Sequence, residues 1–357
     1  MKKIISFILC AVLACSATVV FAGCGSSAES KGEVNVYSWG DYFAPGEDGL
    51  MDVIAEFKDK TGITVNLTTY DTNEELYNML KSSNVSYDVI IPSEYMITKL
   101  IKEDMLLELD YNNIPNYSEI SERFKKLPCD PDGKYTVCYS WGVTAMVYDK
   151  TKVDKKPTSW DTLWDESLKG DILMINNSRD AMAIAMQLCG INPEECTKAD
   201  VDKATAKLAE QKPLLKKYVM DQVFTEMESG QAAVAPYYAG DIAKMMENNE
   251  DLDYAFPEDG SNLFYDAFCI PKSCKNKENA EAFINFMQKP EIAAENCKYL
   301  LYGTPNKGAL EFLDEDIKDN ELTFPNEEYL DKCYTFSDVD DEVYAYMQEQ
   351  FVKVQAE

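Results

Sequence analysis

The sequence predicts an α/β fold built from two units, each a mostly parallel sheet covered by helices. Three observations predict it. Strand-like and helix-like segments alternate along about the first hundred residues, an order typical of parallel sheets with helices on both faces. The chain has 357 residues, which exceeds the size at which one hydrophobic core stops growing. A second alternating region begins near Thr144 and does not repeat the first.

The first unit is expected to contain three strands and two helices. The strands alternate apolar and polar residues or form a short apolar run: residues 34–39, 63–70 and 87–91. Residues 50–60 place apolar side chains on one helical face and end at Thr61-Gly62, a helix stop signal. Asn73 is expected to cap a second helix over residues 74–81.

The second unit is expected to continue the alternation. Its predicted strands are residues 171–175, 231–236 and 252–256, and its predicted helices are residues 178–188, 198–211 and 242–247. Ligands of such sheets bind at the carboxyl ends of the strands. Polar and aromatic side chains follow strands in both units: residues 39–43, 93–95, 177–180 and 237–241.

Composition excludes several classes of enzyme. The chain has no histidine, so it carries no Ser-His-Asp or Cys-His nucleophile and no histidine-ligated zinc ion. It also contains no G-x-S-x-G, P-loop, G-x-G-x-x-G or C-x-x-C motif. We therefore expect no catalysis, no cofactor and no bound metal. The formal net charge of −29 argues against nucleic acid as a partner and favours a cationic ligand.

Residues 1–23 have the pattern of a signal peptide, in which a basic start precedes a long apolar run and small residues. The segment F-A-G-C, ending at Cys24, resembles the lipobox of bacterial lipoproteins, although phenylalanine stands where leucine is usual. We expect an exported protein held by a lipid on Cys24 at the outer face of the cell membrane, or located in the periplasm. Residues 24–33 would form a flexible tether. An uncleaved membrane anchor is the alternative, because the run is only just long enough to span a bilayer.

Eight cysteines lie beyond Cys24. Cys129 and Cys138 flank a predicted hairpin turn, and Cys189 and Cys196 flank a predicted helix end, so each pair is a candidate disulfide. Export permits both bridges, whereas a reducing environment would leave the thiols free. The other four cysteines are Cys269, Cys274, Cys297 and Cys333.

Several segments together carry a resemblance to a known family. They are V-Y-S-W-G-D-Y, Y-D-V-I-I-P-S-E-Y, S-W-G-V-T-A-M, S-W-D-T-L-W with K-G-D-I-L, and L-Y-G-T-P-N, in this order. The chain resembles the spermidine/putrescine-binding proteins of bacterial ABC importers, in a lipoprotein form. The resemblance implies a two-lobed periplasmic-binding-protein fold, with a hinge crossed more than once and a ligand cleft between the lobes. Lobe 1 would comprise residues 34–143 plus 267–310, and lobe 2 residues 144–266 plus 311–357.

The implied ligand is a polyamine, a flexible hydrocarbon chain with ammonium groups at intervals. Aromatic rings cover its methylene groups and attract its cations, while carboxylates form charge-assisted hydrogen bonds with it. The matching motifs place the family's cleft residues at Trp39, Tyr42, Ser93, Tyr95, Asp180, Tyr238, Phe264, Asp266 and Tyr302. For any one ring, packing in a core is the alternative, but placement after strands in both units favours a site.

The chain departs from the family pattern at three candidate site positions, two of those above and Asn177. Asn177 stands where the family often has an acid, and Tyr238 and Phe264 stand where it often has tryptophan. An amide accepts a hydrogen bond without neutralising an ammonium group, so spermidine, putrescine and related amines all stay open as ligands. Arg179 is expected to turn away from a cation site and to pair with acids.

The expected function is therefore capture of a polyamine by a monomeric exported protein that delivers it to an ABC permease in the membrane. One alternative keeps the fold and changes the ligand to another small cation or solute. A second alternative is a secreted hydrolase that uses paired carboxylates such as Asp180 and Asp266.

Overall fold

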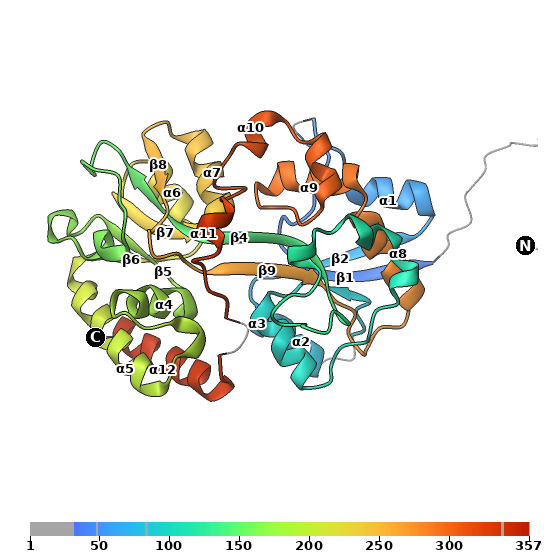
Figure 1. Cartoon of the computed structure of the whole chain (residues 1–357), viewed down its shortest axis with the longest axis horizontal. Helices are drawn as coiled ribbons and strands as arrows, with labels where there is room; N and C mark the ends of the chain where they lie inside the picture. The colour runs from blue at the N-terminus through green and yellow to red at the C-terminus, as the bar shows by residue number, and fades with distance from the viewer. Residues whose placement is uncertain (1–31, 48, 83–84, 337–338, 357) are drawn as a thin grey trace, which may run out of the picture.

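The structure is a computed structural model that describes residues 32–356 except 48, 83–84 and 337–338. The expected signal peptide, the lipid anchor at Cys24 and most of the tether lie outside the described residues. In the part of the chain that is described, no helix is long and apolar enough to cross a membrane. Two groups of strands, each flanked by helices, lie side by side and are joined by two strands at the centre (Figure 1).

The first lobe is built on a parallel sheet with the strand order β2-β1-β3. β1 (Glu33–Trp39) pairs with β2 (Thr64–Tyr70) along its whole length and with β3 (Val89–Ile90) near its centre. The helices that follow these strands are α1 (Val53–Thr61), α2 (Asn73–Ser82) and α3 (Glu94–Lys102). The β-α-β-α-β order predicted from the sequence is present.

Helix α1 begins later than the apolar pattern predicts. The side chain of Asp52 accepts a hydrogen bond from the backbone N–H of Ala55 and caps the helix, so Leu50 and Met51 precede it. The predicted stop is present, because Gly62 has φ of 76° and its N–H donates to the carbonyl of Lys58.

The second lobe is built on a mixed sheet with the order β6-β5-β7-β4-β8, in which β4 is Val137–Asp149. Its strands are β5 (Ile172–Ile175), β6 (Leu215–Val219), β7 (Val234–Tyr238) and β8 (Leu252–Ala255). Its helices are α4 (Ser178–Leu188), α5 (Lys198–Gln211), α6 (Gln222–Glu228) and α7 (Ala239–Asn248). β5 is parallel to β6 and β7, whereas β4 is antiparallel to β7 and β8.

The two lobes share the long strand β4 (Val137–Asp149), which is buried at every position. Its first half pairs antiparallel with β9 (Leu263–Phe268), and from Thr144 onward it pairs with β7 and then β8. β4 was not predicted from the sequence, because a strand buried on both faces shows no alternation of apolar and polar residues. The change of partner at Thr144 makes this strand a link between the lobes (Figure 1).

The chain then returns to the first lobe before it ends on the second. α8 (Lys277–Met287) and α9 (Pro290–Leu300) lie on the first lobe, where Asn296 Oδ1 accepts a hydrogen bond of 3.0 Å from Ala44 N. The remaining helices are α10 (Glu315–Lys318), α11 (Glu327–Leu330) and α12 (Asp341–Ala356). α12 lies beside α4 and α5 on the second lobe (Figure 1).

Residues 311–324 lie beside α9. Leu313 and Phe324 belong to the apolar cluster that contains Cys297 of α9. Thr323 also donates a hydrogen bond of 3.0 Å to the carbonyl of Leu301, directly after α9. This segment therefore covers an apolar face of α9.

The eight cysteines within the described residues are all free, so neither candidate bridge is formed. Burial raises the pKa of thiols such as Cys138 and Cys269, which therefore pack as small apolar side chains. Among the described residues, no group of acidic, cysteine or histidine side chains is placed to hold a metal ion.

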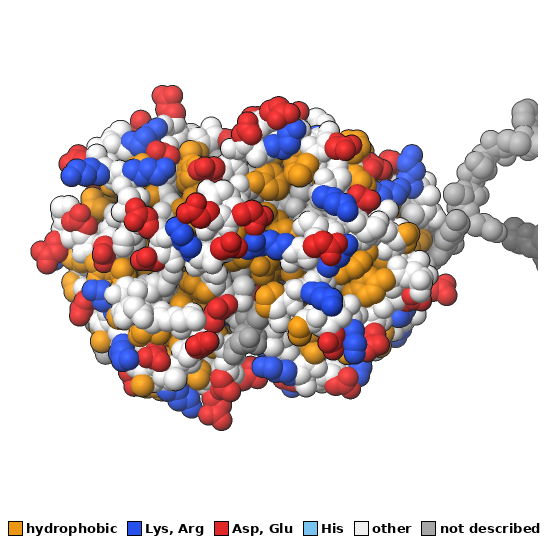
Figure 2. Space-filling model, in the orientation of Figure 1, with side chains coloured by type: hydrophobic (Ala, Val, Ile, Leu, Met, Phe, Trp, Pro, Cys, Tyr) orange, Lys and Arg blue, Asp and Glu red, His pale blue; other side chains and the backbone are white. Residues whose placement is uncertain are grey.

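Charged side chains cover both lobes without gathering at one place on the face shown in Figure 2, where acidic groups are interleaved with lysines. A waist separates the two lobes in the same view. Surface charge alone therefore does not locate a binding site, and the site has to be found from the buried polar groups.

Candidate functional site

The predicted site residues lie where the lobes meet. Trp39 ends β1 and Tyr238 ends β7, while Ser93 and Asn177 directly precede helices α3 and α4. The others lie in the turn after β1, in the first turns of α3 and α4, on β9 and after α9: Tyr42, Tyr95, Asp180, Phe264, Asp266 and Tyr302. The carboxyl ends of the parallel strands thus face the hinge, as expected for ligands of such sheets.

Asp266 on β9 is a buried carboxylate of this group, only 5% exposed. Its Oδ2 accepts a hydrogen bond from the hydroxyl of Tyr42, and Ser93 lies opposite it in an isolated β-bridge. Burial raises the pKa of Asp266 to about 6, and the Tyr42 and Ser93 hydroxyls partly offset this rise. Its Oδ1 is buried and has no hydrogen-bond partner among the described residues. This oxygen is free to accept from a ligand.

Asp180 is the second predicted carboxylate, in the first turn of α4, and both its oxygens have partners. Tyr238 donates to Oδ2 at 3.0 Å, and Asn262 Nδ2 lies 3.3 Å from Oδ1. Burial raises its pKa, and the positive charge of Arg179 opposes the rise. An ammonium group at Asp180 would therefore share the carboxylate with Tyr238 and Asn262.

Asn177 holds the end of α4 in place. Its Oδ1 accepts a hydrogen bond of 3.0 Å from Arg179 N and so caps the helix, and its Nδ2 lies 3.5 Å from the hydroxyl of Tyr238. The side-chain amide of Asn177, which was predicted to contact the ligand, therefore orients Tyr238 and the helix that carries Asp180.

Three of the predicted rings form a continuous row across the hinge. Tyr238 of the second lobe meets Phe264 edge to face at 5.6 Å between ring centroids, and Phe264 meets Tyr302 of the first lobe at the same distance. Tyr302 then donates a hydrogen bond of 2.9 Å to Oδ2 of Asp241, at the start of α7. The row therefore runs from Asp180 at one end to Asp241 at the other.

Two glycines give this row its room, a role that sequence reasoning missed. A Cβ added at Gly142 would lie 2.7 Å from Phe264 Cζ, and one added at Gly240 would lie 2.7 Å from Tyr302 Cδ1. Any larger residue at either position would displace a ring. The signals were present in the S-W-G-V and Y-A-G-D segments, but nothing in the sequence indicated which rings they would meet.

Asp241, in the first turn of α7, belongs to the same group of contacts. Burial raises its pKa to about 6, and the hydroxyl of Tyr302 partly offsets the rise. Its position three residues after Tyr238, in the segment that follows a predicted strand, was the available signal. Asp180, Asp241 and Asp266 are therefore three carboxyl groups whose charged forms lack solvation, an environment that a bound cation would stabilise.

Besides Tyr42, which contacts Asp266, two predicted rings lie apart from the row. Trp39 packs on Tyr70 at 4.7 Å, and its Nε1 is buried without a partner among the described residues. Tyr95 is covered by the guanidinium group of Arg179, whose carbon lies 3.3 Å from the ring centroid. Arg179 pairs with an acid, Glu74, as expected, but it lies against Tyr95 instead of turning away from the predicted site residues.

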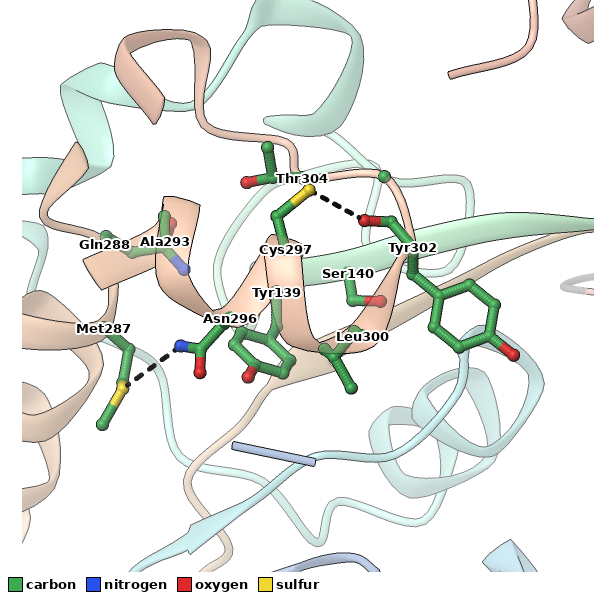
Figure 3. Close-up of a pocket in the computed structure, with 11 residues that line it drawn as sticks. Tyr139, Ser140, Met287, Gln288, Ala293, Asn296, Cys297, Leu300, Tyr302 and Thr304 are labelled. Carbon is green, nitrogen blue, oxygen red and sulfur yellow. Dashed lines mark hydrogen bonds between the residues drawn. The ribbon is translucent and has the colours of Figure 1, made fainter. Parts of the chain in front are cut away.

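Two cavities lie beside these clusters. The first, in Figure 3, is about 10 Å³, room for about one water molecule. It lies behind the loop after α9, where Cys297 Sγ donates to the carbonyl of Tyr302, and the Tyr302 ring points away from it (Figure 3). The second, about 90 Å³, is lined by residues that include Tyr95, Arg179 and Tyr344. Neither is surrounded by the three carboxylates.

A small organic cation suits this geometry, which combines a buried hydrogen-bond acceptor, carboxylates with raised pKa and a row of rings. Comparison with known proteins agrees with a binding role. The model of the bacterial extracellular solute-binding protein family matches residues 52–326. The chain belongs to this family. Its members bind solutes and are not enzymes, so the hydrolase alternative is not favoured.

Named relatives are similar over nearly the whole chain. The spermidine/putrescine-binding periplasmic protein of Escherichia coli is 27% identical over 303 residues, covering 84% of this chain and 85% of that protein. The spermidine/putrescine ABC transporter substrate-binding protein PotD from Streptococcus pneumoniae is 33% identical, covers 91% of this chain and 98% of its own, and superposes with a TM-score of 0.81. A putative spermidine/putrescine ABC transporter protein from Listeria monocytogenes is 34% identical, with coverage of 90% and 98% and a TM-score of 0.84.

Proposed function

We propose that this solute-binding protein captures a polyamine between its lobes and delivers it to an ABC permease. The unpaired oxygen Oδ1 of Asp266 carries the proposal. A buried carboxylate oxygen without a donor is costly, and a ligand ammonium group would supply the missing charge-assisted hydrogen bond. The names of the relatives, which bind spermidine or putrescine, support the same class of ligand.

The carboxylates and rings take different parts of the ligand in this proposal. Asp266 anchors one ammonium group, and Asp180 and Asp241 stand at the two ends of the aromatic row, where further cations of the amine would lie. The ring residues that Arg179 does not cover lie along the methylene groups between the charges: Trp39, Tyr42, Tyr238, Phe264 and Tyr302. Ser93 and Asn177 supply polar contacts and orient the carboxylates beside them.

The domain boundaries and the anchor are also part of the proposal. We place the changes of lobe at Val143 and Thr144 on β4, near Asp266 on β9 and after Phe324, which moves the last boundary from residue 310. The change of strand partner on β4 and the packing of residues 311–324 on α9 support this division. We further propose that the protein works as a monomer held at the outer face of the membrane by a lipid on Cys24.

Calorimetric titration with spermidine, putrescine, spermine and an amino acid tests the proposal. We expect saturable one-to-one binding of at least one polyamine and no heat of binding with the amino acid. If no amine binds, the polyamine proposal fails, and the remaining possibility is another small solute bound in the same fold. The order of the three affinities also shows how the asparagine at position 177 affects the choice of amine.

A further inference from the structure

A second cluster joins the lobes beside the proposed site, and we define it as the Arg179 clamp: Glu74, Tyr95, Arg179 and Tyr344. Glu74 and Tyr95 lie on α2 and α3 of the first lobe. Arg179 lies on α4 of the second lobe, and Tyr344 lies on α12, which packs on that lobe. Every contact between the two pairs therefore crosses from one lobe to the other.

The contacts in the clamp converge on a single carboxylate oxygen. Oε1 of Glu74 lies 3.6 Å from Nη1 of Arg179 and accepts hydrogen bonds from the hydroxyls of Tyr95 at 3.2 Å and Tyr344 at 3.0 Å. The guanidinium carbon lies 3.3 Å from the centroid of Tyr95 and 4.9 Å from that of Tyr344. Arg179 is only 8% exposed, whereas the Glu74 side chain is 38% exposed. Water therefore partly screens the ion pair, and the contact of the guanidinium group with the Tyr95 ring is the better shielded of the two.

We propose that Arg179 is a positioning residue that raises ligand affinity by holding the two lobes together, without touching the ligand. Separating the lobes would carry Arg179 and Tyr344 away from Glu74 and Tyr95, and would break the Arg179–Glu74 ion pair, the Tyr344–Glu74 hydrogen bond and the contact of Arg179 with the Tyr95 ring. The clamp therefore favours the closed arrangement, and observed affinity rises with the stability of the arrangement that encloses the ligand. This inference rests on the proposed polyamine function and assigns Tyr95 to the clamp rather than to the ligand surface.

The position of Arg179 allows a test by the direction in which amine affinity changes when this residue is replaced. Its charge lies close enough to Asp180 to lower the pKa of that carboxyl group, so it would also repel a cation bound there. If Arg179 acted only as a nearby positive charge, removing it would strengthen binding of an amine. If it acts as a clamp, removing it weakens binding.

The experiment compares Arg179→Met with wild type by calorimetric titration with spermidine and putrescine, and by small-angle scattering. We expect Arg179→Met to lose about tenfold in affinity, because it loses a desolvated cation–π contact that forms only when the lobes close. We also expect a larger radius of gyration. Lys203→Met removes the same charge from an exposed side chain on α5, outside the clamp, and should leave both values unchanged.

Tyr344→Phe provides a second variant that changes no charge and keeps the ring. It removes the hydroxyl that donates to Glu74, and we expect a loss of affinity of about threefold. The clamp proposal would be refuted if both variants bound the amines at least as tightly as wild type and had an unchanged radius of gyration. If wild type binds neither amine, the polyamine function fails separately, and the scattering of the variants still decides whether the clamp holds the lobes.

Discussion

Replacing Asp266 by asparagine removes a charge from the centre of the proposed site while keeping the size of the side chain. Asp266 is 5% exposed, and the hydroxyl of Tyr42 donates to its Oδ2. An asparagine carbonyl oxygen can accept the same hydrogen bond, so the contact with Tyr42 is retained. What is lost is the ionised oxygen Oδ1, which has no partner among the described residues.

The substitution should affect binding and folding in opposite directions. A hydrogen bond from an ammonium group to a buried carboxylate contributes about 1.5 to 3 kcal/mol, so we expect a loss of affinity for the amine of about ten- to a hundredfold. Folding responds to the raised pKa. The rise from 3.8 to about 6 makes the ionised group unfavourable in the folded state by about 3 kcal/mol at pH 7.5.

The sign of the pH dependence follows from this raised pKa. The stabilising contribution of the protonated Asp266 is fully present below the unfolded value near 3.8 and is lost as pH rises through about 6. Asparagine does not titrate, so Asp266→Asn should be more stable than wild type at pH 7.5. At pH 5, the difference in free energy of unfolding between the variant and wild type should be about half as large as at pH 7.5.

Calorimetric titration measures the affinity, and urea unfolding at pH 5 and pH 7.5 measures the free energy of unfolding. Asp59→Asn, on the exposed side of α1, serves as a matched control that should change neither quantity. Wild-type affinity for the amine in Asp266→Asn would refute the assignment of this carboxylate to the ligand. A variant less stable than wild type at pH 7.5 would refute the argument from burial.

Three further predictions concern the rings and the pH range. Trp39→Ala should weaken amine binding about tenfold but lower the melting temperature only slightly, since this half-buried ring packs mainly on Tyr70; a large fall would return it to the core. Asp241→Asn should weaken binding about tenfold, because it removes a charge that would face the ligand. Tyr302→Phe removes only the hydroxyl that donates to Asp241 and should weaken binding about fivefold or less. Equal effects of the two variants would show that the charge of Asp241 is not used. Affinity for the amine should also fall as pH decreases from 8 to 5. Asp241 and Asp266 both have a pKa of about 6, and a neutral carboxyl group attracts an ammonium group weakly. An affinity that does not change over this pH range would contradict both assignments.

Much of the fold could be predicted because its signals are local. The strand at residues 34–39 and the helices at residues 178–188 and 198–211 match the structure within a residue, since periodicity and caps are written in consecutive residues. The hinge strands β4 and β9 were missed as strands. β4 is buried on both faces, so its sequence gives no alternation to detect.

The candidate site divides in the same way. The motifs alone supplied its residue types and most of its members, including Asp180, Asp266 and the rings. The motifs could not show that Arg179 covers Tyr95, or that Asp241 accepts a hydrogen bond from Tyr302 across the hinge. These contacts depend on where α4 and α7 lie relative to the first lobe.

The sequence by itself determined the α/β alternation, the resemblance to a solute-binding family and the presence of acids and rings after the strands. Only the tertiary structure decided which carboxylate oxygen lacks a partner and which ring meets a cation of the protein itself. The reason is separation along the chain: Tyr42 and Asp266 are 224 positions apart, and they meet only because β9 returns to the first lobe. Burial, and with it each pKa, arises from such returns and not from neighbouring residues.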